Sequence, residues 1–467
     1  MMNRRGGRRL LRLLAMAFLI LAAWPQDKVE DRRRALDPRT PTTDDPRRIP
    51  RPPVAGGPEG SIVLVGGRIF DGTGKAPFFG TLVIRRNLIE RVLPPGKAEW
   101  PSDAQVIDVS GKTVLPGLID AHTHIDYVGS DTPWHLEASE ADAMLRAVER
   151  SRFYLECGIT SVRDLGSLGD VPFRLKEWIS RNRVPGPRIF TCGAYITSTG
   201  GHGAEGLDLD HTGPAHTRLA SGPDAWREAV REQFSRGADL IKIGSHFSRE
   251  EVRACVEEAH ALGLKVACDA ETHYIQWAVE AGVDTIEHPL PRTDETIRLM
   301  AEKQTAAVPT LIPYIYIFDG AGGYFGSTSR RFTFSKGANF EVLRRMRAAG
   351  VRMGVGTDLV ADRFRYLPAP YISELEQFVA AGFTIREALA AATRTNADIL
   401  DMGDKLGTLE PGKLADVSVF DGKPDERLQD LAEAVHVIRD GYLVVKNGSV
   451  VVSRHRPVPP PQPRRPG

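Results

Sequence analysis

Residues 115–125 read L-P-G-L-I-D-A-H-T-H-I, an apolar run that ends in two histidines, His122 and His124. Such a run is typical of a buried β-strand. Side chains alternate along a strand, so residues two apart point to the same side. Both imidazoles are therefore predicted to face one site at the end of the strand, in an arrangement that holds a divalent cation. The alternative, two solvent-facing histidines on an edge strand, is disfavoured because the run is so apolar.

The composition is that of a globular protein. The chain has 467 residues, of which 42% are hydrophobic and 26% charged, and its net charge is +1. This balance gives no reason to expect nucleic acid as a partner. The four cysteines form no C-x-x-C pair, so they indicate neither a disulfide framework nor a thiolate zinc site.

The two ends of the chain are predicted to lie outside the fold. Residues 1–24 place arginines before a short apolar run, which predicts a signal peptide or an uncleaved short anchor. We therefore expect an exported protein, periplasmic or secreted, with no other contact to a membrane. Residues 25–60 and 454–467 are rich in Pro and Arg, and we expect a flexible linker and tail there.

Two separate segments, 61–115 and 405–453, contain short β-rich runs bounded by turn residues such as Asp71-Gly72, Ser110-Gly111 and Asn447-Gly448. Neither segment can close a core alone. We predict that their antiparallel strands join in one β-sandwich that is split in the sequence by everything between them.

Between these segments, in residues 116–404, predicted strands alternate with amphipathic helices such as 249–262 and 385–397. After the strand that carries the two histidines, the predicted strands are 158–164, 188–192, 240–243, 265–270, 285–287, 306–311 and 352–356. Eight such units favour an α/β fold with a (β/α)₈ TIM barrel over an open sheet. The chemistry is then expected at the carboxyl ends of the strands.

Three residues at or near these strand ends are candidates for the same site. Asp358 ends the last strand in G-T-D, where it equally fits a helix cap. His288 closes the sixth strand, although a lone histidine there is often structural. Lys242 lies in an apolar strand, where its charge must be paired or removed. A lysine carboxylated by CO₂ would supply a carboxylate that bridges two cations.

At these residues the chain resembles the amidohydrolase superfamily of metal-dependent hydrolases, in the branch with imidazolonepropionase-like proteins and Xaa-Pro dipeptidases. The motifs that carry the resemblance are P-G-L-I-D-A-H-T-H (116–124), G-P-R-I-F-T-C-G-A-Y-I-T-S-T-G-G-H-G (186–203), I-K-I (241–243), A-G-V-D-T-I-E-H (281–288), G-T-D (356–358) and L-G-T-L-E-P-G-K-L-A-D (406–416). The resemblance covers residues 61–452 and implies a barrel with a composite β-sandwich. It also implies one or two divalent cations, zinc being the first candidate, with Lys242 as a carboxylated bridge and these metal ligands: His122, His124, His288 and Asp358.

One position departs from the branch. Its members usually carry a histidine at the end of the fifth strand, where this chain has Asp269 in V-A-C-D-A. An aspartate is itself a competent oxygen ligand. We expect Asp269 to retain metal binding with altered preference, and His273 is a possible substitute. The alternative is that the second metal position has decayed.

The resemblance implies cleavage of a peptide bond, in an Xaa-Pro-like dipeptide or at a peptide C-terminus, or of a cyclic amide. The attacking group would be a metal-activated hydroxide, with Asp358 as proton acceptor. Candidate substrate contacts are His202, Arg163 and Tyr314, although His202 equally fits a role within its glycine-rich loop and Asp164 could neutralise Arg163. The competing hypothesis is a catalytically impaired binding protein. One-metal deaminase or lactonase chemistry is disfavoured because it needs no lysine bridge. The sequence leaves a homo-oligomer open.

Overall fold

The computed structural model describes residues 46–48, 57–97, 99–127, 139–204, 216–270, 273–289, 293–313, 315, 336–359 and 369–451. The predicted signal segment and the predicted tail lie outside the described residues. Within the linker, Arg48 donates to the carbonyl of Ala238 at 3.1 Å, and its guanidinium lies over the ring of Phe234. This part of the linker therefore packs on the folded protein, which corrects the prediction of a free tether at residues 46–48.

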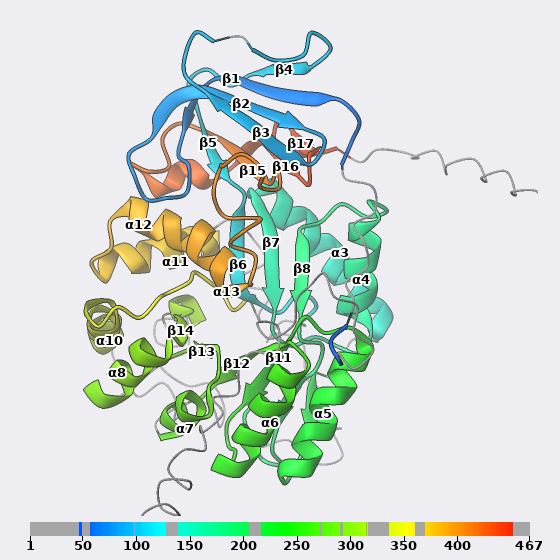
Figure 1. Ribbon diagram of the computed structural model, residues 1–467, viewed down its shortest axis with the longest axis vertical. Coiled ribbons are helices and arrows are strands. Elements are labelled where there is room, and N and C mark those ends of the chain that lie inside the picture. Colours follow the sequence, from blue (N-terminus) through cyan, green and yellow to red (C-terminus); the bar gives the residue numbers. More distant parts are fainter. Residues whose placement is uncertain are drawn as a thin grey trace, which may run out of the picture.

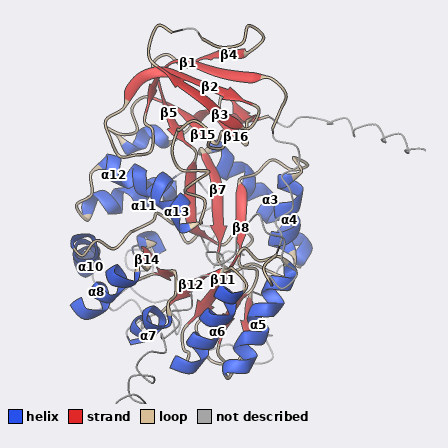
Figure 2. Ribbon diagram, viewed as in Figure 1, coloured by secondary structure: helices blue, strands red, loops and turns tan. Residues whose placement is uncertain are grey.

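The strands fall into two regions (Figures 1 and 2). The sheet at one end of the molecule contains β1 (Ser61–Ile69), β2 (Phe78–Arg85), β3 (Leu88–Leu93), β4 (Gln105–Asp108), β5 (Lys112–Pro116), β15 (Val417–Asp421), β16 (Ala434–Arg439), β17 (Tyr442–Lys446) and β18 (Ser449–Val450). The other strands are β6 (Leu118–Thr123), β7 (Ile159–Asp164), β8 (Arg188–Thr191), β9 (Tyr195–Thr197), β10 (Thr217–Leu219), β11 (Leu240–Gly244), β12 (Lys265–Asp269), β13 (Thr285–Glu287) and β14 (Ala306–Val308).

Helices lie around the second set of strands (Figure 2). They are α3 (Glu140–Glu156), α4 (Val171–Ser180), α5 (Pro223–Arg236), α6 (Arg249–Ala261), α7 (His273–Ala281), α8 (Asp294–Lys303), α10 (Lys336–Ala348), α11 (Ala369–Ala380), α12 (Ile385–Ala390) and α13 (Asn396–Ile399), with a π-helical turn at Ala391–Thr395 and a 3₁₀ turn at Leu428–Leu431. Within the described residues, we find no helix with the length and hydrophobicity of a membrane span.

Both flanks of the sequence contribute to the nine-stranded sheet, because β5 pairs with β15 in antiparallel register from Lys112↔Asp421 to Pro116↔Val417. The sheet is mixed, which corrects the prediction of antiparallel pairing throughout. Strand β1 pairs in parallel with both β4 and β5, which follow one another along the same edge. Gly111 at φ +77° therefore joins two strands that run in the same direction, and it is not a hairpin turn. Closure of this sheet into a sandwich stays a prediction.

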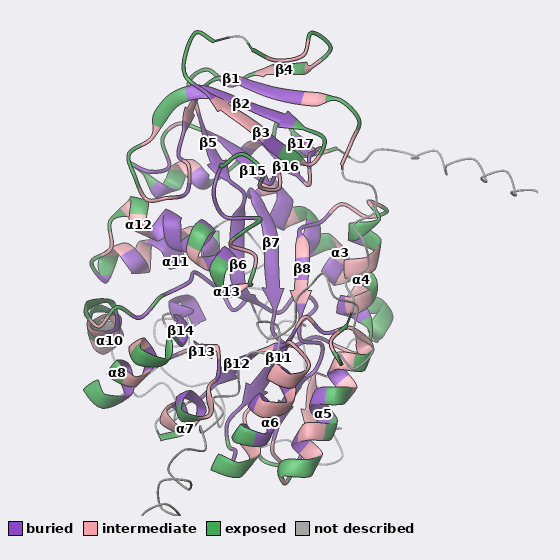
Figure 3. Ribbon diagram, in the orientation of Figure 1, coloured by how far each residue is buried: buried purple, intermediate pink, exposed green. Residues whose placement is uncertain are grey.

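The strand that carries the histidines is shorter than predicted. The chain changes its hydrogen-bonding partner at Gly117, whose N–H donates to the carbonyl of Asp416, whereas the next N–H, from Leu118, donates to Gly158. Strand β5 thus belongs to the outer sheet, and β6 starts the inner strands beside β7. The described residues of β6 and β7 are buried throughout (Figure 3).

Backbone hydrogen bonds connect the inner strands in one circular order. The parallel pairs β6–β7–β8 and β11–β12–β13–β14 are joined by a bond from the Asp239 N–H to the Thr191 carbonyl. At the other side, Gly354 bonds to Ala307 of β14, and the N–H of Ala121 in β6 donates to Val355. This connectivity is the one expected of a TIM barrel, and the mixed α/β content agrees with the predicted class. Strands β9 and β10, inserted after β8, were not predicted.

The predicted strand at 352–356 forms only an isolated bridge, Met353 to Ala307. Asn396 of α13 supplies further hydrogen bonds at this point. Its Nδ2 donates to the carbonyls of Ile119 at 2.6 Å and Val355 at 2.8 Å, and its Oδ1 accepts from the N–H of Val355 at 3.0 Å. One buried side chain thus links the last strand segment to β6.

We predict that Asn396→Ala lowers the free energy of unfolding by about 2–4 kcal/mol, because several buried backbone groups lose a partner. The matched control is Thr393→Ala on the same helical segment, which removes one local hydrogen bond to Leu389 and is expected to cost about 1 kcal/mol. Urea unfolding measures both changes. Equal costs for the two variants would contradict the role assigned to Asn396.

Candidate metal centre

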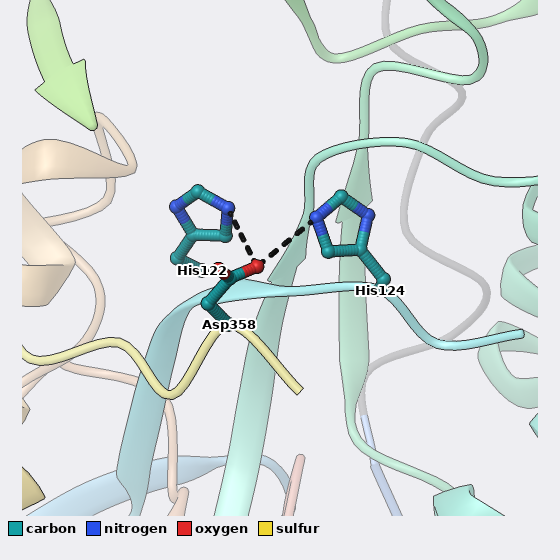
Figure 4. Close-up of side chains that lie close together, drawn as sticks. All are labelled: His122, His124 and Asp358. Atoms are coloured by element: carbon teal, nitrogen blue, oxygen red, sulfur yellow. Dashed lines mark ion pairs between the residues drawn. The ribbon is translucent and has the colours of Figure 1, made fainter. Parts of the chain in front are cut away.

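His122, His124 and Asp358 converge at the carboxyl end of β6 (Figure 4). The Oδ1 atom of Asp358 lies 3.4 Å from Nε2 of His122 and 3.3 Å from Nε2 of His124. Two ligands that hold zinc at tetrahedral angles lie about 3.4 Å apart, given metal–ligand bonds of about 2.0–2.1 Å. The three side chains therefore have the spacing of a metal site.

The protonation states of His122 and Asp358 also agree with binding of a cation. Burial lowers the pKa of His122 well below its usual value, which favours the neutral imidazole whose nitrogen can coordinate. Its Nε2 atom is buried and has no hydrogen-bond partner among the described residues. Burial alone would raise the pKa of Asp358, but His122, His288 and His124 outweigh it, and the carboxyl stays ionised.

The Nδ1 atom of each histidine is held by the protein, which directs Nε2 into the site. His122 Nδ1 lies 2.7 Å from Oε2 of Glu287, and His124 Nδ1 lies 2.9 Å from the carbonyl of Gly166. His288 Nδ1 contacts the hydroxyl of Thr310. Partners of this kind orient histidine ligands in metal sites.

Asp358 is positioned by its own backbone and by the residue before it. Its N–H donates to the carbonyl of His122 at 2.7 Å. Thr357 donates from both its N–H and its hydroxyl to Asp120, which is fully buried. Burial raises the pKa of Asp120 to about 7 despite these hydrogen bonds. The turn after residue 356 is thereby fixed against β6.

Three residues that follow inner strands adopt the left-handed backbone conformation, which is uncommon for residues other than glycine. His288 has φ +51°, Thr310 has φ +47° and Asp358 has φ +49°. Such strain persists where the surrounding structure enforces it, and it concentrates at functional sites. The three residues lie at the carboxyl ends of strands, where the sequence predicts the chemistry.

A second group of donors surrounds Asp269 at the end of β12. Its Oδ2 atom lies 3.0 Å from Nε2 of His202, 3.7 Å from Nε2 of His288 and 4.0 Å from Nζ of Lys242. His288 connects the two groups, because its Nε2 also lies 3.8 Å from Oδ2 of Asp358. All six predicted metal ligands are therefore brought together.

The structure places the residues predicted to contact substrate in different surroundings. Arg163 is buried, and its guanidinium donates to the Ala121 carbonyl, to Thr285 and to Glu287, which corrects its assignment to substrate. His273 is exposed and packs on Tyr274 and Trp277, so it does not replace the buried Asp269. Tyr314 lies outside the described residues.

Glu287 lies in the site and was not among the residues predicted from the sequence. It accepts from Thr285 at 2.6 Å and from Arg163 at 2.7 Å, and it contacts His122. It is completely buried. The available signal was a carboxylate in a short apolar strand immediately before a candidate ligand, since a buried charge requires partners.

Comparisons with known proteins agree with this geometry. The family model described as "Amidohydrolase family" matches residues 113–451. An imidazolonepropionase of Geobacillus kaustophilus is 28% identical over an alignment of 390 residues that covers 76% of this chain and 86% of the relative. An ochratoxinase of Aspergillus niger is 27% identical over an alignment of 374 residues that covers 71% of this chain and 75% of the relative.

Among solved structures, a prolidase crystallised with N-methylphosphonate-L-proline is 31% identical, with a TM-score of 0.74. The similarity covers 83% of this chain and all of that chain, 100%. The resemblance stated from the sequence motifs is thus confirmed. Since the family model spans most of the chain, this protein belongs to the amidohydrolase family, with enzymes that act on carbon–nitrogen bonds among its relatives.

Proposed function

We propose that this protein is a metal-dependent amidohydrolase that cleaves an amide bond in a small peptide, with an Xaa-Pro-like dipeptide as the first candidate substrate. The observation that carries the proposal is the convergence of His122, His124 and Asp358 at metal-ligand spacing. The similarity to a prolidase complex supports the substrate class. A cyclic amide is the second candidate, favoured by the imidazolonepropionase relative.

In this proposal a divalent cation, zinc being the first candidate, is held by the imidazoles and carboxylates described above, and when bound it lowers the pKa of water and polarises the substrate carbonyl. Asp358 accepts the proton of the attacking water and passes it to the leaving nitrogen. Its two oxygens face different histidines, Oδ1 toward His122 and His124 and Oδ2 toward His288. The carboxylate is thus placed between both halves of the site.

Charge balance links the number of cations in the site to the chemical state of Lys242. The pair of Arg163 and Glu287 is neutral. An ammonium at Lys242 with carboxylates at Asp269 and Asp358 leaves one net negative charge, whereas a carbamate at Lys242 leaves three. Buried charge requires compensation, so the carbamate form matches two divalent cations and the ammonium form matches one.

The impaired binding protein is the weaker hypothesis. It was motivated by Asp269, but this carboxylate lies among His202, His288 and Lys242 and is only 1% exposed. An aspartate that had lost its role would gain no advantage from burial among polar groups. Its retained place in the site supports a functional second half.

A panel of Xaa-Pro dipeptides, other dipeptides and cyclic amides tests the function with the metal-loaded protein. We predict that Asp358→Asn lowers kcat at least about 100-fold, since general acid–base catalysis contributes about 10²–10⁴-fold. The matched control is Asp401→Asn, the same chemical change at an exposed carboxylate, which should leave kcat unchanged. Absence of hydrolysis across the panel, or an active Asp358→Asn, would overturn the proposal.

We predict that Lys242→Ala loses most of its bound metal, because the buried side chain supplies a ligand in the carboxylated form. Short carboxylic acids such as acetate should partly restore metal content by filling the space. Elemental analysis of the purified variant measures the loss. Metal content equal to that of the wild type would contradict the bridging role.

We predict that Glu287→Gln raises the metal dissociation constant about 10–100-fold, because mutation of partners that orient ligands has effects of this size. Competition with a coloured chelator measures the affinity. Glu295→Gln, at an exposed position of α8, is the control for the same chemical change. An unchanged dissociation constant would refute the orientation of His122 by Glu287.

A further inference from the structure

The geometry points to His202 as a metal ligand of the second half of the centre, where it supplies the nitrogen donor that Asp269 lacks. This inference rests on the proposed function, because it assumes that the site binds divalent cations. It concerns a loop residue after β9, in the G-G-H-G stretch, whose role the sequence left open between substrate contact and loop structure.

The first argument is the position of three donors around one oxygen. His202, His288 and Lys242 come from different elements, and each directs a nitrogen toward Oδ2 of Asp269, at 3.0, 3.7 and 4.0 Å. Ligands that share a cation at angles of about 90–110° lie about 2.9–3.4 Å apart when bonds are about 2.1 Å. The His202–Asp269 distance falls in that range, whereas the distances from His288 and Lys242 to the same oxygen exceed it.

The second argument is that the loop is built to hold His202 in place. The N–H of His202 donates to the carbonyl of Ser245, which follows β11, and Gly201 donates to Ser198 at 2.8 Å. A Cβ atom at Gly201 would lie 2.8 Å from that same Ser245 carbonyl. Glycine thus permits a close approach of the loop to the strand that carries Lys242.

The third argument is the surroundings of the ring. Tyr195 stacks with the ring of His202, at 6.4 Å between centroids, and Nζ of Lys242 lies 5.9 Å from the centroid of the same tyrosine. His202 is partly exposed, at 23% of its side chain, whereas Asp269 is buried. The imidazole thus reaches solvent while the carboxylate that it contacts does not, which agrees with a ligand at the mouth of the site.

The test is a titration of the metal-free full chain with Co²⁺, followed by visible absorption, with zinc content measured in parallel. The wild type should bind two equivalents. His202→Ala should keep the first equivalent and bind the second at least 10-fold more weakly, with a changed absorption band. His273→Ala, which removes a histidine at an exposed position shortly after Asp269, should match the wild type. Equal thermal unfolding of the metal-free forms shows that folding is intact.

A compensating variant makes the test stricter. Asp269→His combined with His202→Ala returns a nitrogen donor on the strand and should recover the second equivalent. If His202→Ala binds both equivalents with wild-type affinity and loses only kcat, His202 contacts substrate and the inference is wrong. If the wild type binds a single equivalent that His202→Ala does not weaken, it is also wrong. Two equivalents without hydrolysis of any amide would instead refute the proposed function and leave the ligand assignment standing.

Discussion

The contacts at the Nδ1 atoms of three histidines determine the geometry of the centre. Each imidazole has two nitrogens, and the one that the protein occupies decides where the other points. Glu287 holds His122, the carbonyl of Gly166 holds His124, and Thr310 holds His288. Without these contacts the rings could rotate, and the common distance to Asp358 would be lost.

Glu287 itself needs a positively charged partner, because its carboxylate lies in the protein interior. Arg163 provides it from β7 and is itself satisfied by Thr285 and by a backbone carbonyl. A chain of buried polar contacts therefore runs from β7 through β13 to β6. Its members stabilise one another, and removal of any one leaves a buried group without its partner.

The sequence predicted the centre better than its surroundings. The i, i+2 spacing of His122 and His124 and the positions of Asp269 and Asp358 at strand ends follow from local rules, and these residues do meet. The role of Arg163 could not be predicted in this way, because its partner Glu287 is 124 residues away in the sequence. The exposed position of His273 depends on where α7 begins, which sequence patterns locate poorly.

The strands were likewise predicted where the hydrophobic periodicity is strong. Strand boundaries were missed where the backbone changes its hydrogen-bonding partner. Most inner strands appear close to the predicted residues, but the run through 115–125 is divided at Gly117 between two sheets. The dipeptide Pro116-Gly117 at the division is a turn signal, but the residues on both sides of it are apolar and buried, so hydrophobic pattern alone predicts one continuous strand. The strand at 352–356 was predicted from its apolar residues, whereas its backbone bonds go partly to the Asn396 side chain.

The pairing of β5 with β15 has a consequence for how the protein is made. Pro116 and Val417 are partners across about 300 residues of intervening chain, so the contact is of very long range. During synthesis β1 to β5 leave the ribosome first, and the free edge of β5 stays open until the whole inner domain has followed. Strand β5 also leads directly into β6. The strand that leads into the histidine strand therefore gains its partner β15 only after β7 and the other neighbours of β6 have been made.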